Sequence, residues 1–122
     1  MSIYHRFAQE VTDGEGRLLR LTLNYPGNFN FGYDVVDALA EESPEKIALV
    51  WCNTQGEERR FTFRQLRQES SRMANVLSRA GIGQGARVMV VLKRHYEYWF
   101  AAIALHKLGA VMIPATHMLT EG

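Results

Sequence analysis

The sequence contains very little cysteine. Its single cysteine, Cys52, can form no internal disulfide, and no second cysteine or histidine stands near it to suggest a metal site. A single thiol of this kind is typical of proteins from a reducing compartment. Because Cys52 ends the apolar run IALVWC, we expect it to be a buried strand cysteine.

The sequence also lacks segments that would direct the chain into or across a membrane. Residues 1–10 (MSIYHRFAQE) do not combine a basic start with an apolar run, so no secretory signal is predicted. The longest apolar-rich stretch, Tyr96–Leu108, is too short to span a bilayer and contains Glu97, His106 and Lys107. We therefore expect a cytoplasmic protein without a membrane-spanning segment.

Patterns for catalysis or metal binding are missing as well. The sequence shows no paired carboxylates, no metal-ligand spacing and no nucleophile with a neighbouring base. Its histidines are too dispersed to suggest a shared site; they are His5, His95, His106 and His117. The residues by themselves thus indicate no catalytic residue and no metal ligand.

Charge is plentiful but unevenly distributed. Residues 1–58 carry ten acidic residues against four basic ones, whereas residues 59–122 carry ten basic residues against three acidic ones. A basic half could serve a polyanion, but aromatic residues do not interleave with its arginines, four of which spread along one predicted helix. We expect a solvated helix face and no nucleic-acid partner. The four arginines are Arg64, Arg67, Arg72 and Arg79.

The length of 122 residues and the hydrophobic content of 47% suit one compact domain and are too small for two. Residues 1–32 are predicted to form an N-terminal arm, with a short strand at 17–23 and a turn-rich segment at 25–32. Residues 33–122 are predicted to form an α/β segment.

The first part of this segment predicts a helix followed by a β-hairpin. Asp34 is the expected N-cap of a helix over 35–42, which Pro44 closes. A strand-like run at 47–52 and an alternating run at 59–63 flank a turn, which is the pattern of a hairpin.

A second, capped helix comes next. Thr62 and Gln65 have the form of a capping box, so the helix is predicted to begin near Phe63. The glycine-rich stretch at 81–85 follows a helix and precedes a strand, whereas a phosphate-binding loop needs the reverse order. We therefore interpret these glycines as formers of a turn with positive φ angles.

The rest of the chain predicts a strand–helix–strand unit. The run 88–92 is apolar without alternation, as in a central strand of a parallel sheet that is covered on both faces. A helix over 96–108 ends at Gly109 before a second strand at 110–113, which makes a right-handed βαβ unit. The loop 115–120 then lies at the carboxyl end of a parallel strand, where α/β proteins usually place ligands.

Three stretches, in this order and spacing, resemble one enzyme family. FNFGYDVVDALA at 29–40 is similar to its lead-in helix. TFRQL at 62–66 and SRMANVLSRAGIGQGARVMVVL at 71–92 are similar to its helix, glycine turn and strand, and EYWFAAIALHKLGAVMIPATHMLT at 97–120 to the completion of its βαβ unit. The family is that of the adenylate-forming acyl-CoA synthetases, in particular their medium-chain branch. The resemblance implies the N-terminal portion of the family's large α/β domain.

The resemblance also implies a chemistry. Members of the family activate a carboxylic acid, such as a fatty acid, with ATP and Mg²⁺ to an acyl-adenylate and transfer the acyl group to coenzyme A. The family's phosphate loop, nucleotide-binding motifs and catalytic lysine have no counterpart in residues 1–122. We therefore expect an N-terminal fragment that is inactive alone and binds none of these cofactors tightly. The loop after Pro114 is expected near the entry of the coenzyme A pantetheine arm, which makes His117 and Met118 candidate contacts.

The sequence departs from the family before its last helix. In the family, prolines are common at the positions of Lys93 and Tyr96. Their absence here should lower the rigidity of the backbone only slightly and leaves the expected fold unchanged. Together with Arg94 and His95, Lys93 adds positive charge at the carboxyl end of a strand. The sequence leaves open whether these positively charged side chains bind a phosphate group.

Two other functions stay open at this point. The chain could be a short, non-catalytic binding or assembly module that pairs with another chain through an exposed sheet edge. It could also bind coenzyme A or a nucleotide by itself through its basic half. An unfinished sheet predicts exposed apolar residues and self-association. The residues expected to be exposed are Met89, Val91, Trp99 and Ile103.

Overall fold

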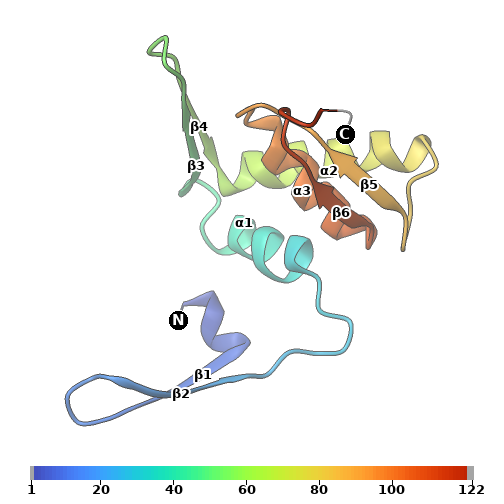
Figure 1. Ribbon diagram of the computed structural model, residues 1–122. Helices are drawn as coiled ribbons and strands as arrows, with labels where there is room; N and C mark the ends of the chain where they lie inside the picture. The colour runs from blue at the N-terminus through green and yellow to red at the C-terminus, as the bar shows by residue number, and fades with distance from the viewer. Residues whose placement is uncertain (1, 121–122) are drawn as a thin grey trace.

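The computed structural model describes residues 2–120 and confirms an α/β fold. Figure 1 shows helices α2 and α3 beside the parallel strand pair and the β3–β4 hairpin, whereas the β1–β2 hairpin lies apart from them, beyond α1. The strands pair as β1–β2 and β3–β4, both antiparallel, and as β5–β6, which is parallel. The elements are η1 (Ile3–Arg6), β1 (Ala8–Thr12), β2 (Leu18–Leu23), η2 (Gly32–Asp37), α1 (Ala38–Glu42), β3 (Ile47–Cys52), β4 (Glu58–Thr62), α2 (Phe63–Arg79), β5 (Arg87–Val90), α3 (Glu97–Leu108) and β6 (Val111–Pro114).

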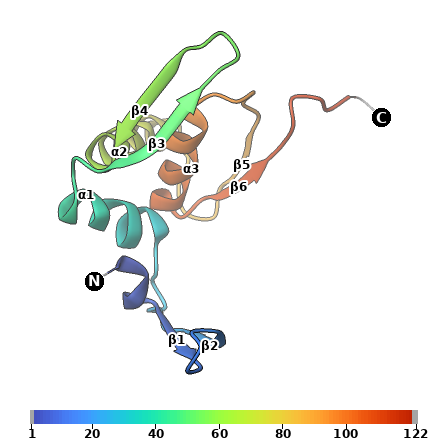
Figure 2. The same cartoon turned by 90° about the vertical axis from the view of Figure 1, so that its left-hand side faces the viewer.

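The N-terminal arm contains a hairpin of which the sequence predicted only the second strand. Its turn is closed by Asp13, whose carboxylate accepts hydrogen bonds from the backbone N–H groups of Glu15 and Arg17, at 2.9 and 2.8 Å. The hairpin projects from the body in both views (Figure 1, Figure 2). An edge-to-face contact between Phe7 and Phe29 packs η1 and β1 against the segment that leads into the first helix. The division into 1–32 and 33–122 stays a prediction.

The prediction of Asp34 as the first helix's N-cap is wrong. The helix begins earlier, because the side chain of Asn30 accepts a hydrogen bond from the N–H of Gly32 at 3.0 Å. Asp34 instead accepts from the N–H of Asn30 at 2.6 Å, so it completes a reciprocal cap from within the first turn. The first turns are π-helical and continue into α1, and Val36 and Ala40 are buried.

The second helix starts where the sequence predicted. The Thr62 hydroxyl accepts from the N–H of Gln65 at 3.2 Å, and the Gln65 side chain accepts from the N–H of Thr62 at 2.9 Å. The glycine stretch is confirmed as an α-to-β turn, with φ of +88° at Gly81 and +78° at Gly85. The hairpin β3–β4 is also confirmed, although β4 begins at Glu58 and ends at Thr62, because Thr62 leaves the strand to cap α2.

The core lies between α2, α3 and η2. Val36, Leu66, Phe100 and Ile103 form its buried cluster, against which Ala48, Phe61 and Tyr96 pack from the hairpin and the start of α3. Ile103 is only 5% exposed, so the prediction that it faces an uncovered surface is wrong. The reason is that η2 and α2 both pack against α3 and cover it.

A buried ion pair joins the three helices at the core. The Lys107 side chain is 1% exposed, and its Nζ donates to Asp37 Oδ1 at 2.8 Å and to Ser71 Oγ at 3.0 Å. The same Nζ lies 5.6 Å from the centre of the Tyr33 ring. Lysine is almost never buried without such partners, so Lys107 fixes η2 and α2 relative to α3.

The two predictions about strand coverage need correction. Cys52 is exposed, not buried, because β3 belongs to a two-stranded hairpin whose end extends past the helices. Among residues 2–120, β5 pairs with β6 alone, so it is not the central strand that was expected. Met89, at 60% exposure, and Val91 lie on the uncovered side, and Trp99 is exposed as predicted.

We predict that Lys107→Met lowers the free energy of unfolding by about 3 kcal/mol, because it leaves the Asp37 carboxylate buried without its closest cation. Denaturant unfolding of the 122-residue chain measures this difference. Arg17→Met is the control, since Arg17 pairs with Glu15 at the surface, where their side chains are 77% and 72% exposed, and its loss should cost less than about 1 kcal/mol. Equal losses in the two variants would contradict a role for the buried pair.

We also predict that the 122-residue chain self-associates through the β5–β6 face, because parallel sheets are normally covered on both faces. Val91→Lys should shift the sedimentation profile toward the monomer. Val76→Lys, on the exposed face of α2, is the matched control and should leave the profile unchanged. A monodisperse wild-type monomer that unfolds cooperatively at high temperature would show this prediction to be wrong.

Candidate functional site

The site with the clearest chemistry lies at the carboxyl edge of the parallel pair. Val90 and Pro114 are partners at the ends of β5 and β6, and the N–H of Ala115 donates to the carbonyl of Val90 at 3.0 Å. The loop 91–96 and the loop 115–119 therefore leave the sheet side by side. This is the edge where open α/β sheets usually bind ligands.

The loop after β5 carries three consecutive basic side chains. Lys93, Arg94 and His95 are all exposed, and within residues 2–120 none of them takes part in an ion pair. The backbone of Arg94 is left-handed, with φ of +53°, which a residue other than glycine adopts only at a cost. The indole Nε1 of Trp51 donates to the Arg94 carbonyl at 2.7 Å and holds it in place.

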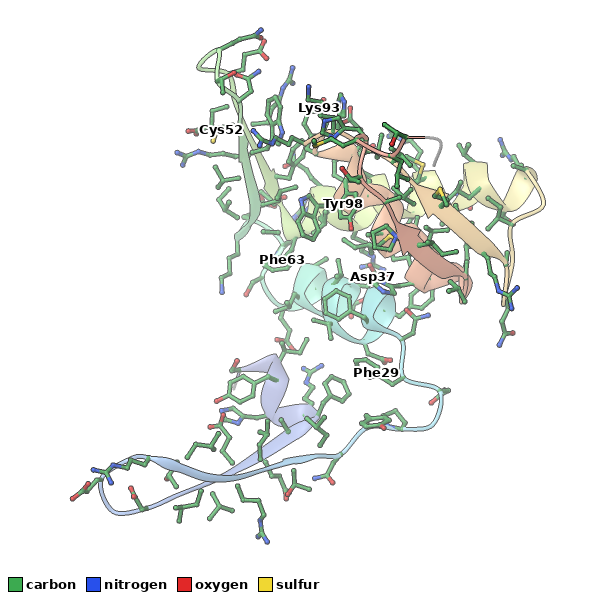
Figure 3. All side chains as sticks on the ribbon, in the orientation of Figure 1. Phe29, Asp37, Cys52, Phe63, Lys93 and Tyr98 are labelled. Carbon is green, nitrogen blue, oxygen red and sulfur yellow. The ribbon has the colours of Figure 1, made fainter. Side chains whose placement is uncertain are left out.

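This loop, the end of the β3–β4 hairpin and the start of α3 together line a shallow, open pocket of about 340 Å³, which we call the edge pocket. Figure 3 places Cys52 on the hairpin, Lys93 on the loop and Tyr98 on the helix. Aromatic rings and cations thus share one small concave surface. The residues that line the edge pocket are Trp51, Cys52, Leu92, Arg94, His95, Tyr98 and Trp99.

His117 and Met118 lie on the neighbouring loop and are not among the residues that line the edge pocket. Both are exposed, Met118 to 73%, and the N–H of Met118 donates to Thr116 Oγ1 at 3.1 Å in a local turn. The structure brings them to the same sheet edge as the basic loop. Their contact with coenzyme A stays a prediction.

A larger cleft of about 530 Å³ between α2 and α3 is chemically different. Glu97 lines it, and the Oε2 atom of Glu97 is buried with no hydrogen-bond partner among the described residues. Arg72, the arginine that lines this cleft, forms an ion pair with Glu69, with Arg72 Nη1 3.2 Å from Glu69 Oε1. Carboxylates outnumber free cations in this cleft, so it is less suited to a phosphate-bearing ligand than the smaller edge pocket.

Neither a metal site nor a membrane segment is found among residues 2–120. No three His, Cys, Asp or Glu side chains there lie close enough to hold a metal ion. No described helix is long and apolar enough to cross a bilayer. The turn 81–85 lies at the amino end of β5, away from the edge pocket.

Sequence reasoning found the basic loop but missed Trp51 and the pocket. Trp51 stands 43 residues before Arg94, and nothing in its own strand marks it as a partner of that loop. The one signal available was a tryptophan at the end of a hairpin strand, where an amphipathic ring seeks a hydrogen-bond acceptor.

The comparison with protein families settles the class of the protein. The model of a family described as AMP-binding enzyme matches residues 36–122. The chain belongs to this family. The match covers both helices of the core, the parallel pair and the basic loop.

The curated relatives that match include acyl-CoA synthetases. The chain is 38% identical over 119 residues to the acyl-coenzyme A synthetase ACSM3, mitochondrial, of Homo sapiens. The aligned region covers 93% of this chain and 20% of the relative. It is 40% identical over 102 residues to the acyl-coenzyme A synthetase ACSM5, mitochondrial, of Homo sapiens, and this aligned region covers 79% of this chain and 18% of the relative. The chain thus spans about a fifth of the length of the curated relatives it matches.

Solved structures of family members have the same fold. The fatty acid AMP ligase from Legionella pneumophila superposes with a TM-score of 0.68 at 26% identity, over 74% of this chain and 16% of that chain. The N-terminal subdomain of NpsA from Klebsiella oxytoca gives a TM-score of 0.64 at 30% identity, over 72% of this chain and 22% of that chain. These likenesses confirm the predicted correspondence to the N-terminal part of adenylate-forming enzymes.

We predict that Trp51→Phe lowers the free energy of unfolding by about 1 kcal/mol, because the Arg94 carbonyl loses its donor. Trp99→Phe is the control, since Trp99 is half exposed and its indole N–H has no protein acceptor within the described part of the chain. Thermal or denaturant unfolding compares the two. A larger loss for Trp99→Phe than for Trp51→Phe would refute the assigned role of Trp51.

Proposed function

We propose that the whole protein is an AMP-forming acyl-CoA synthetase that activates a carboxylic acid, such as a fatty acid. The observation that carries this proposal is the 38% identity to an acyl-coenzyme A synthetase over 119 residues, together with the family match over residues 36–122. The substrates of the proposed reaction are the acid, ATP and coenzyme A.

The proposed reaction has two steps. An oxygen of the substrate carboxylate attacks the α-phosphorus of ATP and pyrophosphate leaves, which gives an acyl-adenylate. The thiol of coenzyme A then attacks the acyl carbonyl carbon, loses its proton and expels AMP, which gives the thioester. Activation is needed because a free carboxylate is a poor electrophile until one of its oxygens becomes part of a good leaving group.

Residues 1–122 are proposed to supply scaffold and ligand contacts, not the reacting groups. The sequence shows no paired carboxylates and no nucleophile with a neighbouring base, and among residues 2–120 no group of His, Cys, Asp or Glu side chains could hold a metal ion. We therefore propose that the 122-residue chain alone is inactive, and that Mg²⁺ enters with ATP and is held by residues outside this range. His117 and Met118 are proposed to contact the pantetheine arm from the loop after β6.

A non-catalytic assembly module is the second candidate function. The exposed apolar face of β5–β6 favours it, since such a face suits pairing with another chain. The coding sequence after codon 122 distinguishes the two candidates. A stop codon there favours the module, whereas an open frame that encodes a Ser/Thr/Gly-rich phosphate loop rejects it.

The location in the cell is proposed to be cytoplasmic, on the single unpaired cysteine of the sequence. The curated relatives quoted above carry the word mitochondrial in their names, which is a statement about those proteins. Fractionation of the source cells with compartment markers tests the proposal.

We predict that the full-length protein releases pyrophosphate from ATP only when a carboxylic acid is present. The 122-residue chain should release none. Addition of coenzyme A should then release AMP and form the thioester in equal amounts. Omission of the acid is the control for each form. Robust turnover by the 122-residue chain would overturn its assignment as a scaffold, and a full-length protein that never releases pyrophosphate with any fatty acid would overturn the synthetase proposal.

A further inference from the structure

The cleft between α2 and α3 contains a buried carboxylate oxygen that no described residue satisfies. Glu97 Oε2 is closed off from solvent and has no hydrogen-bond partner, and Glu97 forms no ion pair within residues 2–120. A carboxylate oxygen removed from water is costly unless it is paired. A cation that enters the cleft would supply the missing partner.

The first turn of α3 does not satisfy this oxygen. Glu97 is the first residue of the helix, where the helix dipole favours a negative charge. Two amide donors of the turn are already used, because the N–H of Tyr98 donates to the carbonyl of His95 at 3.2 Å. The N–H of Trp99 likewise donates to the carbonyl of Tyr96 at 3.1 Å. The position suits a carboxylate, but its hydrogen bonds have to come from elsewhere.

The arginine that lines the cleft already has a partner of its own. Arg72 and Glu69 form an ion pair between neighbouring turns of α2. Among the described residues the lining contains two acids and one base, so one negative charge is left over, and Glu97 is the acid without a partner. Charge complementarity therefore favours a cationic occupant.

The walls of the cleft suit an arginine better than a lysine. The rings of Phe61 and Tyr96 line it with their centres 5.1 Å apart, and Met73 and Val76 continue the lining along α2. A guanidinium stacks on aromatic rings and binds a carboxylate through two parallel hydrogen bonds, whereas an ammonium is a compact, strongly hydrated charge. The apolar stem of an arginine side chain fits against aliphatic side chains such as these.

The size of the cleft indicates a protein segment as the occupant. Its volume of about 530 Å³ is larger than one side chain needs, so the backbone that carries the arginine enters with it. Val76 lines the cleft and is 57% exposed, which leaves the cleft accessible from outside. The chain spans about a fifth of the length of the curated relatives quoted above, so a protein of that length has further segments to place there.

We propose that an arginine from a segment of the whole protein outside residues 1–122 lies in the α2–α3 cleft and pairs with Glu97. The proposal rests on the proposed function, because it requires a protein of the length of its relatives. The pair holds that segment against the core of α2 and α3. Glu97 is thus a docking residue for the rest of the fold, not a catalytic residue.

Photo-cross-linking in the full-length protein tests which segment lies in the cleft. Val76→p-benzoylphenylalanine places the probe in the lining at a position that is exposed enough to accept it. Ser78→p-benzoylphenylalanine is the matched control, since Ser78 is exposed on another side of α2 and does not line the cleft. Peptide mass spectrometry should find the Val76 probe joined to one arginine-containing segment outside residues 1–122, within a single copy. The Ser78 probe should not reach that segment.

Substitution of the acid tests the pairing itself. Glu97→Gln in the full-length protein keeps the shape of the side chain and removes its charge. The rate of thermal unfolding, followed by circular dichroism, should rise at least about tenfold, because a buried guanidinium then lacks its carboxylate. Glu69→Gln makes the same change in the same cleft on an acid that is paired at the surface, so it should change the rate less than about threefold.

The arginine of the cross-linked segment completes the test. Its replacement by methionine should raise the unfolding rate about as much as Glu97→Gln does. If the two groups form one pair, the combination of both changes should add less than about twofold to either alone. Effects that multiply as independent ones would overturn the pair.

The other outcomes separate this proposal from the proposed function. A cross-link from Val76 to a second copy, to a segment without arginine, or to nothing would overturn the docking of the arginine. Equal effects of Glu97→Gln and Glu69→Gln would show that water or Arg72 satisfies the carboxylate, and would overturn it as well. Pyrophosphate release is measured separately, so the docking can fail in an active synthetase, and an occupied cleft can be found in a full-length protein without synthetase activity.

Discussion

The buried pair of Lys107 and Asp37 is the interaction on which the arrangement of the helices depends. It places a cation with 1% exposure between η2, α2 and α3, where the carboxylate, the hydroxyl of Ser71 and the ring of Tyr33 offset the loss of water. The pair also restricts a neighbour. A Cβ at Gly32 would come within 2.6 Å of Lys107 Cγ, so the approach of η2 to α3 requires glycine there. Looser packing of η2 against α3 would expose the Lys107 ammonium to water or separate it from the Asp37 carboxylate.

The same geometry explains the uneven charge of the sequence. The acidic first half supplies Glu41 and Glu45 beside α1, and the basic second half supplies Arg64 and Arg67 on α2, so the two halves meet as ion pairs. Such exposed pairs contribute little stability each. The basic side chains without an ion pair among residues 2–120 are spread over the fold, and two of them, Lys93 and Arg94, lie on the loop after β5.

The parallel pair connects this charge to function. β5 and β6 end together, which places the basic loop and the loop of His117 at one edge, and the hairpin brings Trp51 against that edge. Open α/β sheets usually bind their ligands at this edge. One face of the same strands is uncovered among the described residues, whereas parallel sheets are normally covered on both faces.

Local sequence determined the elements whose information lies within a few residues of each other. The capping box of Thr62 and Gln65, the positive φ angles at Gly81 and Gly85 and the strand–helix–strand unit follow from side-chain chemistry at short range, and all are confirmed. Tertiary structure decided what depends on partners far along the chain. The pairing of Lys107 with Asp37, the exposure of Cys52 and the bond from Trp51 to Arg94 join residues tens of positions apart or depend on which layer covers a strand. No local pattern specifies such contacts, since burial is a property of the assembled fold.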